Sequence, residues 1–307
     1  LLPEAAAILD EPFADPSFLP TLLLSRFTRK SVTVALAGDG GDELFAGYDP
    51  FLAHRPAALL ARAPAAALCA LSRAAALLPT SSANMSLGFR ATQLLRGLDG
   101  PPSLRHQQWL SAFLPAELRA LLHPDLAQLA TPEIAYREVL ADARRGQALG
   151  VAPGSVDEAL RFYLLRYLAD DILVKADRAS MAASLELRAP FLDTAVVELA
   201  ARLPWRLKLS ALHTKVVLRR AAQDLVPEEI LRRPKKGFGI PVAAWIRGPL
   251  RPLFEELMDE KEIAAAGIFR PAAVRSLLSR HLSGEADLRK PLWTLFMFLL
   301  FRKRAFL

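Results

Sequence analysis

The segment AGDGGDELFAGY, residues 37–48, combines three carboxylates with four glycines. Asp39, Asp42 and Glu43 would repel one another unless a hard cation, a basic side chain or solvent compensates their charge. A Mg²⁺ ion that carries a nucleotide phosphate fits such a set of oxygen ligands, and the glycines let backbone N–H groups turn toward an anion. The competing interpretation is a solvated turn, because Gly and Asp are common turn formers. A helix-loop-helix calcium site is disfavoured, because the spacing misses the D-x-[DN]-x-[DN]-G pattern.

The apolar run Val32–Leu36 directly before this segment indicates where it lies in the fold. The run alternates too little for a half-exposed strand, and its short length and β-branched valines predict a strand buried on both faces. The acidic loop then follows the carboxyl end of a strand, which is the edge of an open α/β sheet where ligands collect.

A second acidic segment, DEPFADPS at residues 10–17, precedes the helix that we expect over 19–29. It is a rigid loop because it contains two prolines. Asp15 and Ser17 stand where they would cap the helix, and capping is the favoured interpretation over a ligand site.

The segment DDILVKADRASMAASLELRAPFLD, residues 170–193, places charged residues on an otherwise apolar stretch with helical periodicity. Buried charges must be paired, so internal ion pairs are the favoured interpretation. The sharper alternative is that Arg188 clamps a substrate carboxylate. The charged residues are Lys175, Asp177, Arg178, Glu186 and Arg188.

The segment RRPKKGFGIPVAAWI, residues 232–246, presents Lys235 and Lys236 ahead of two glycines. A lysine held by such a loop can act as a point charge on a phosphate and stabilise the charge that develops in a transition state. A solvated basic loop explains the spacing equally well.

Composition excludes several classes of protein. With 307 residues, 52% of them hydrophobic, the chain is globular, and its longest apolar run, Leu292–Phe301, is well short of the about 18 residues of a membrane span. The net charge of +7 is spread over amphipathic helices, so we expect no nucleic-acid partner. The five histidines lack metal-ligand spacing, and the chain has neither a G-x-S-x-G elbow nor a P-loop.

Cysteine content and the chain start bear on the compartment. The single cysteine, Cys69, excludes an internal disulfide, and its apolar helical context predicts a buried structural thiol. Without a secretory leader we expect a cytoplasmic protein. The chain begins at Leu1 without Met, and its first strand comes only at Val32, so we expect that sequence is missing upstream.

Coarse periodicity predicts one α/β domain in which a partial parallel sheet leads into a mainly helical region. The segment 79–104 has loop composition. We expect helices at 19–29, 44–53, 57–77, 116–122, 132–145, 156–184 with a break, 195–203, 214–225, 242–247, 250–258, 271–281 and 291–302.

These segments, in this order, closely resemble the synthetase domain of glutamine-dependent asparagine synthetases from about Asp10 to the C-terminal helix. The resemblance implies an adenine-nucleotide alpha hydrolase-like fold of the ATP pyrophosphatase type, with residues 1–307 forming a synthetase domain that is incomplete at its N-terminus. It also implies an activity that uses ATP and Mg²⁺: the side-chain carboxylate of aspartate is adenylated with release of pyrophosphate, and ammonia then displaces AMP. A homodimer is compatible with the family.

The resemblance assigns roles by position. Asp39 matches the acidic residue beside the acyl-adenylate, Asp42 matches the carboxylate that holds Mg²⁺, and Lys235 matches the lysine that stabilises the adenylation transition state. Arg188 belongs to the signature E-x-R-x-P-F-L-D, either in an ion pair or as a substrate contact. The residues that shape the ATP and pyrophosphate loop are Gly38, Gly40, Gly41 and Glu43.

The departures from the family are specific. The upstream Ser-Gly-Gly-x-Asp-Ser loop that binds pyrophosphate is absent, and LSGEAD at 282–287 lacks its second glycine. The glutaminase domain that releases ammonia from glutamine is absent as well. Ala37 and Ala46 stand where serine and glycine are usual.

Three hypotheses follow. The first is the C-terminal part of an asparagine synthetase-type amidotransferase. The second is a specialised relative that adenylates another carboxylate, on a peptide, a sugar acid or a β-lactam precursor. The third is a non-catalytic remnant that serves as a helical scaffold.

Overall fold

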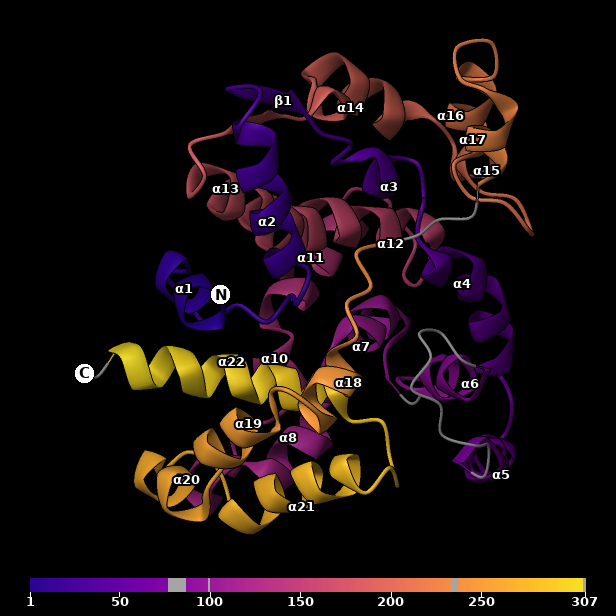
Figure 1. The fold of residues 1–307 in the computed structure, drawn as a ribbon. Helices are drawn as coiled ribbons and strands as arrows, with labels where there is room; N and C mark the ends of the chain where they lie inside the picture. Colours follow the sequence, from indigo (N-terminus) through magenta and orange to yellow (C-terminus); the bar gives the residue numbers. More distant parts are fainter. Residues whose placement is uncertain (77–86, 99, 234–236, 306–307) are drawn as a thin grey trace.

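The computed structural model describes residues 1–76, 87–98, 100–233 and 237–305. Helices dominate it, and a small parallel sheet of two strands lies at its upper edge in Figure 1. This confirms the predicted α/β class with a mainly helical C-terminal region. None of the described helices is both long enough and apolar enough to cross a membrane.

The sheet pairs two segments that lie far apart in the sequence. Strand β1 (Val34–Leu36) runs parallel to β2 (Glu186–Arg188), with Val34 opposite Glu186, and the N–H of Ala37 donates to the carbonyl of Arg188 at 2.8 Å. The strand before the acidic loop is therefore confirmed. The helix expected over 156–184 ends three residues earlier, at Met181, and Ser184 takes a left-handed φ of 55° that turns the chain into β2.

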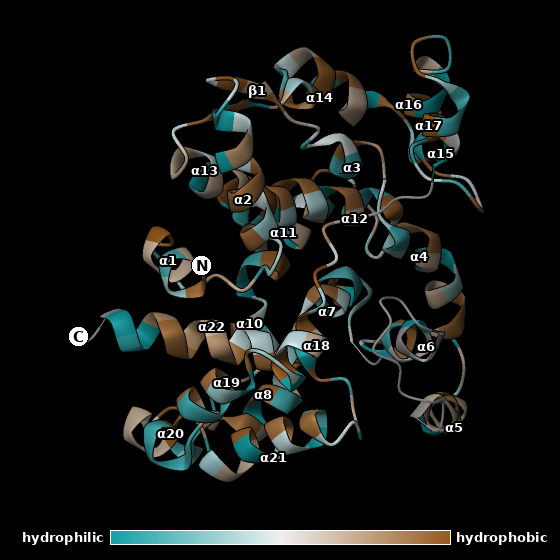
Figure 2. Ribbon diagram, in the orientation of Figure 1, coloured by the Kyte–Doolittle hydropathy of each residue, from teal (hydrophilic) through white to brown (hydrophobic). Residues whose placement is uncertain are grey.

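The predicted burial of β1 on both faces is wrong. Leu36 is 75% exposed and Val34 38% exposed. Among the described residues, β1 pairs with β2 alone, so no further strand covers it. Figure 2 shows this apolar strand at the periphery of the molecule.

The first half of the chain is built from short helices and one 3₁₀ turn. Prolines and glycines interrupt the helical periodicity often, which keeps the elements short. The elements are α1 (Leu2–Ile8), α2 (Phe18–Arg29), α3 (Gly41–Leu44), α4 (Asp49–Leu60), α5 (Ala65–Ala76), α6 (Leu87–Leu95), η1 (Pro102–Leu104), α7 (Arg105–Leu110), α8 (Pro115–Leu121), α9 (Pro124–Ala127), α10 (Pro132–Ala135) and α11 (Arg137–Ala148).

The second half contains the longest helical run and the C-terminal helices. Residues 156–181 form a continuous helical run whose middle is π-helical, so the helix type changes where the sequence suggested a break, and the helix is not interrupted. The elements are α12 (Val156–Phe162), η2 (Tyr163–Ile172), α13 (Leu173–Met181), η3 (Pro190–Leu192), α14 (Thr194–Arg202), α15 (Trp205–Lys208), α16 (Val216–Ala221), α17 (Glu228–Arg232), α18 (Val242–Arg247), α19 (Arg251–Leu257), α20 (Glu260–Ala266), α21 (Pro271–Leu282) and α22 (Arg289–Ala305).

Several expected helices differ from the observed ones. Those at 116–122, 195–203, 242–247, 250–258, 271–281 and 291–302 are confirmed to within a few residues. Helix α4 starts later than expected and continues through Pro56, and the helix expected over 132–145 is divided at Tyr136. The segment predicted as loop contains α6, and Cys69 is exposed on α5 rather than buried. Packing decides these points, because propensity alone is a weak guide to helix boundaries.

The main core lies between α1, α2 and the C-terminal helices α18–α22, at the lower left of Figure 1. Phe254 of α19 stacks on Phe296 of α22, with ring centroids 4.2 Å apart and planes 8° from parallel, and neither side chain is exposed. This core anchors α2 beneath the sheet.

Helix α2 packs against α13, and two ion pairs fasten the loop 10–17 to that helix. Lys175 Nζ lies 2.8 Å from Asp15 Oδ2, and Arg178 lies 2.7 Å from Asp10 Oδ2. The ion-pair interpretation of the α13 charges is confirmed for these residues. Ser17 is the N-cap residue of α2, but its hydroxyl donates to Asp15 at 2.8 Å instead of accepting from the helix.

Two buried histidines link α4 to α7. His54 Nε2 lies 3.0 Å from the carbonyl oxygen of Gly154, which only accepts, so this nitrogen carries the proton. His54 Nδ1 then accepts from His106 Nε2 at 2.9 Å, and His106 Nδ1 faces the Tyr163 hydroxyl at 3.5 Å. Burial, together with the Arg105 charge, lowers the pKa of both histidines, so the fold favours their neutral forms.

This pair predicts that stability falls as the pH drops below about 6.5, the ordinary histidine value. The unfolded chain binds more protons there than the folded chain, so the free energy of unfolding falls by up to about 1.4 kcal/mol per pH unit for each histidine. Urea unfolding between pH 8 and pH 5 measures the slope. His106→Asn is expected to flatten it, and the exposed His213→Gln to leave it unchanged. Equal slopes for the two variants would contradict the prediction.

Candidate active site

The acidic loop connects β1 to α3 and is shaped by two of its glycines. Gly40 has a φ of 89°, and a Cβ there would lie 2.3 Å from Leu192 Cδ2. A Cβ on Gly41 would lie 3.3 Å from the Phe191 ring. Glycine is therefore required at position 40 and favoured at 41, whereas nothing crowds Gly38.

Asp42 forms an ion pair that the sequence did not reveal. Its Oδ1 atom lies 2.8 Å from Lys215 Nζ, and both side chains are about one quarter exposed. Gly47 makes room for this carboxylate, because a Cβ there would lie 1.9 Å from Asp42 Oδ1. Lys215 lies just before α16 and has a left-handed φ of 53°. Nothing in the sequence around Lys215 indicates that it pairs with Asp42.

Glu43 points away from solvent into an aromatic cluster. It is 2% exposed and accepts a hydrogen bond from the Tyr48 hydroxyl. The Tyr48 ring stacks on Tyr163 of η2 with centroids 5.1 Å apart. Glu43 therefore anchors the loop to the long helix, which fits the expectation that it shapes the loop.

Asp39 faces the charged end of α13. Partial burial raises the pKa of its carboxyl, and the Lys175 charge opposes that effect. Among the described residues, Asp39 has neither an ion-pair partner nor a hydrogen-bond partner for its side chain, because Lys175 is bonded to Asp15. The Asp39 carboxylate is thus available to a ligand.

Asp171 of η2 is a further acid in this region that the sequence analysis did not select. Burial and the neighbouring Asp15 raise the pKa of Asp171 to about 7, while Lys175 and Lys290 act in the opposite direction. Its signal in the sequence is its position four residues before Lys175, which puts both on one helical face. A carboxyl with a pKa near 7 can exchange a proton at neutral pH.

The structure brings together Asp39, Asp42 and Glu43 but gives each a different environment. Arg188 ends β2 beside β1, where it is 64% exposed and its Nε lies 2.8 Å from Glu186 Oε1. Lys235 lies outside the described residues. LSGEAD forms the turn between α21 and α22 rather than part of this loop.

The described residues contain no group of three His, Cys, Asp or Glu side chains that could by itself hold a metal. A Mg²⁺ ion delivered on a nucleotide needs only one or two carboxylates, since phosphates and water complete its shell. The partly exposed Asp42 fits that requirement, with Lys215 as its partner in the absence of a nucleotide.

Ala46, two residues beyond α3, occupies a conformation that favours glycine. Its φ is 54°, and its side chain is fully buried. This agrees with the expectation from the sequence that glycine is usual at the position.

The sequence profile of the asparagine synthase family matches residues 1–303. The chain belongs to the asparagine synthase family. It is 30% identical, over 97% of its length, to a Bacillus subtilis protein named asparagine synthetase (glutamine-hydrolysing) 1. It is 36% identical, over 97% of its length, to a Mycobacterium tuberculosis protein provisionally given the name asparagine synthetase.

Coverage of these relatives is partial. The chain spans 43% of the mycobacterial protein and 45% of the B. subtilis protein. A Penicillium rubens protein named an amidase is 27% identical over 78% of this chain, which spans 36% of that protein. Proteins similar to this chain therefore carry more than one name.

Proposed function

We propose that this chain is the synthetase part of an ATP-dependent amidotransferase that converts aspartate to asparagine through an acyl-adenylate. The observation that carries the proposal is the acidic loop at the carboxyl end of β1, within a family match that covers nearly the whole chain. In the proposed reaction the aspartate carboxylate displaces pyrophosphate from ATP, and ammonia then displaces AMP.

The proposed roles of the residues are those that the family resemblance implies, and the environments of Asp39, Asp42 and Glu43 support them. Asp42 holds Mg²⁺, and Lys235 stabilises the charge that develops on the phosphate. Gly38, Gly40 and Gly41, with Glu43 as their anchor, present the loop backbone to ATP. Asp39 is available to the adenylate or to the incoming ammonia, and Arg188 is a candidate contact for the carboxylate substrate.

We propose that residues outside this chain complete the nucleotide site. The Ser-Gly-Gly-x-Asp-Ser loop is absent from the 307 residues, the relatives are about twice as long, and β1 leaves Leu36 exposed. A glutaminase domain that supplies ammonia would belong to the same missing part.

Aspartate-dependent exchange of labelled pyrophosphate into ATP tests the proposed adenylation. We expect exchange with the whole protein and not with residues 1–307 alone, and calorimetric titration with Mg-ATP is expected to show the same difference. If neither form binds Mg-ATP, the non-catalytic scaffold is favoured instead.

A second candidate is adenylation of a carboxylate other than aspartate, and it is kept because one similar protein does not carry the name asparagine synthetase. Exchange that requires a carboxylate other than aspartate would support it. Product analysis for asparagine separates the two candidates directly.

Variants of Asp42 and of its partner Lys215 separate the proposed Mg²⁺-binding role of Asp42 from a purely structural role of the ion pair. We expect Asp42→Asn to weaken Mg²⁺-dependent ATP binding by about tenfold or more, because a carboxylate ligand is lost. Lys215→Met removes the ion-pair partner and leaves the carboxylate in place. Mg²⁺ titrations of ATP binding in both variants and in the double variant provide the measurement. An unchanged Mg²⁺ dependence in Asp42→Asn would remove this residue from the metal site.

A further inference from the structure

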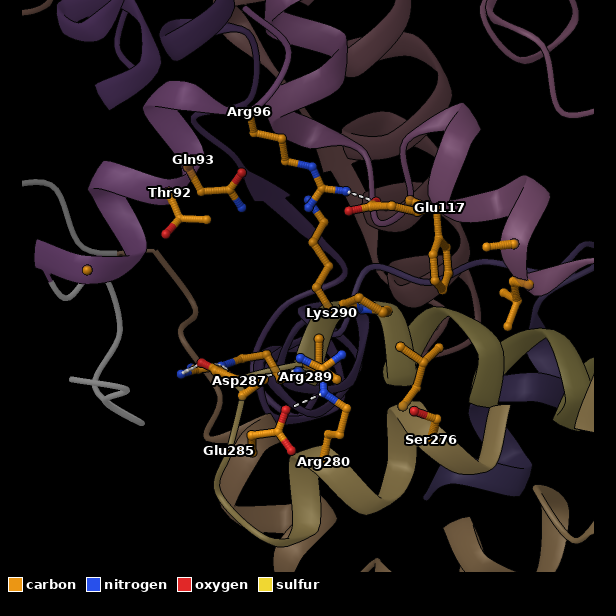
Figure 3. A pocket seen from close by; sticks show the side chains of 18 of the residues that line it. Thr92, Gln93, Arg96, Glu117, Ser276, Arg280, Glu285, Asp287, Arg289 and Lys290 are labelled. Atoms are coloured by element: carbon orange, nitrogen blue, oxygen red, sulfur yellow. Dashed lines mark hydrogen bonds and ion pairs between the residues drawn. The ribbon is translucent and has the colours of Figure 1, made fainter. Parts of the chain in front are cut away.

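A cavity of about 820 Å³ lies between α6, α8 and the C-terminal helices α21 and α22. Its volume is within the range of sites for small organic ligands. Both apolar and charged side chains line it, and those labelled in Figure 3 come from opposite walls. The turn between α21 and α22 is neutral, whereas Lys290 of α22 and Arg96 beside α6 bring positive charge to the cavity.

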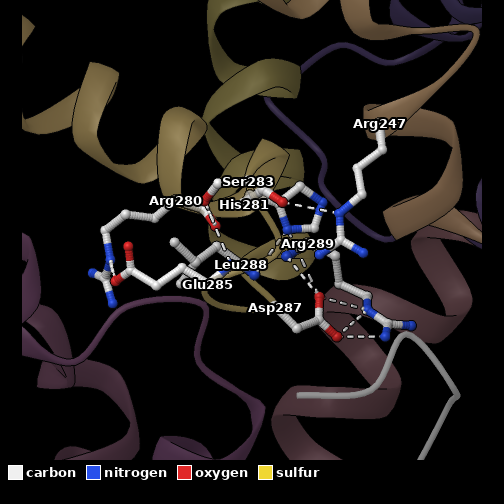
Figure 4. Close-up of polar contacts among 8 residues, drawn as sticks. All are labelled: Arg247, Arg280, His281, Ser283, Glu285, Asp287, Leu288 and Arg289. Atoms are coloured by element: carbon white, nitrogen blue, oxygen red, sulfur yellow. Dashed lines mark hydrogen bonds and ion pairs between the residues drawn. The ribbon is translucent and has the colours of Figure 1, made fainter. Parts of the chain in front are cut away.

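The turn between α21 and α22 forms a neutral wall. Arg280 pairs with Glu285 at 2.6 Å, and Arg289 pairs with Asp287. His281 stabilises the turn, since its Nδ1 accepts from the N–H of Leu288 at 3.1 Å, and its carbonyl accepts from Arg247, as Figure 4 shows. These contacts leave no excess charge in the turn.

Lys290, the second residue of α22, differs from the charged residues of the turn because it has no ion-pair partner among the described residues. Figure 3 shows its side chain extending across the cavity toward the guanidinium of Arg96 on the opposite wall. Its ammonium donates to the carbonyl of Leu110 and forms no ion pair with any described carboxylate. Burial by the surrounding protein and the Arg96 charge lower the pKa of Lys290 to about 8, although the charges of Asp171 and Asp15 oppose this effect.

Arg96 is only partly neutralised. One of its terminal nitrogens lies 2.6 Å from Glu117 Oε2, and its buried Nε has no partner among the described residues. Gln93, one helical turn earlier, has a buried Oε1 that also lacks a partner there. Arg96, Lys290 and Glu117 together carry one excess positive charge, and two cations that face each other in this way are stabilised by an anion between them.

We propose that this cavity binds a small anion whose carboxylate or phosphate bridges Lys290 and Arg96, and that a hydroxyl or amino group of the ligand donates to Gln93. The Lys290 ammonium has three N–H donors, and the bond to Leu110 uses one of them, so two remain for a ligand. The Arg96 Nε–H donor and the Gln93 Oε1 acceptor have no partner among the described residues. The site is distinct from the acidic loop, because none of the loop residues lines the cavity.

Calorimetric titration of the whole protein with inorganic phosphate and, separately, with malate tests this proposal. Saturating Mg-ATP is present throughout, so that the nucleotide site does not contribute. We expect saturable binding of at least one anion with a stoichiometry of one. Tighter binding of phosphate would identify a phosphate ligand, and tighter binding of malate would identify a hydroxycarboxylate.

Lysine variants test whether the anion binds in this cavity. Lys290→Gln is expected to weaken it at least tenfold, Lys290→Arg to retain it, and Lys261→Gln, at an exposed lysine of α20, to leave it unchanged. The Lys290→Arg variant also shows whether loss in Lys290→Gln comes from charge or from misfolding. Failure of both anions to bind, or equal binding in Lys290→Gln and Lys261→Gln, would overturn the proposal.

Discussion

Replacing Lys235 with alanine is expected to slow adenylation by about 10²–10³-fold while changing ATP affinity only a few-fold. The physical reason is that a point charge aimed at the reacting phosphate acts mainly on the charge that develops in the transition state. Pyrophosphate exchange at saturating ATP measures the rate, and calorimetry measures the affinity. The experiment requires the whole protein, since the proposed nucleotide site is completed outside this chain.

The adjacent Lys236 provides a matched control, because it has the same charge and the same chain environment in RRPKKGFG. Lys236→Ala is expected to retain most of the rate. If both alanine variants slow adenylation equally, the rate depends on the positive charge of the basic segment as a whole and not on Lys235 in particular. If Lys235→Ala loses affinity and rate in proportion, its charge acts in the ground state and the transition-state role is wrong.

Replacing Phe296 with alanine is expected to lower the free energy of unfolding by about 3–5 kcal/mol. The ring is fully buried and stacks on Phe254 at the centre of the main core, so its removal leaves a cavity between α19 and α22. Urea unfolding followed by circular dichroism measures the loss. The fold is expected to persist at low temperature, because the remaining core residues are unchanged.

Leu149→Ala is the comparison for that variant, since Leu149 is an apolar side chain that is 76% exposed. Leu149→Ala is expected to change the free energy of unfolding by no more than about 0.5 kcal/mol. Similar losses in the two variants would mean that Phe296 does not lie in a tightly packed core.

Local signals in the sequence were sufficient for much of the fold. Helical periodicity identified α18, α19, α21 and α22, and the run before the acidic loop identified β1. Strand β2 was missed, because three residues after an amphipathic helix carry too little periodicity of their own. Their strand conformation depends on hydrogen bonding to β1, which is a contact across some 150 residues.

The family and the position of the acidic loop with its glycines can be predicted from the sequence, because residue types at fixed spacing carry that information. The partner of each charge is visible only in the folded chain: Lys215 for Asp42, Tyr48 for Glu43 and Asp15 for Lys175. The cavity between Lys290 and Arg96 was likewise absent from any local pattern, since the two residues are almost 200 positions apart. Charge pairing and cavities depend on distance in space, which a linear pattern of residues does not specify.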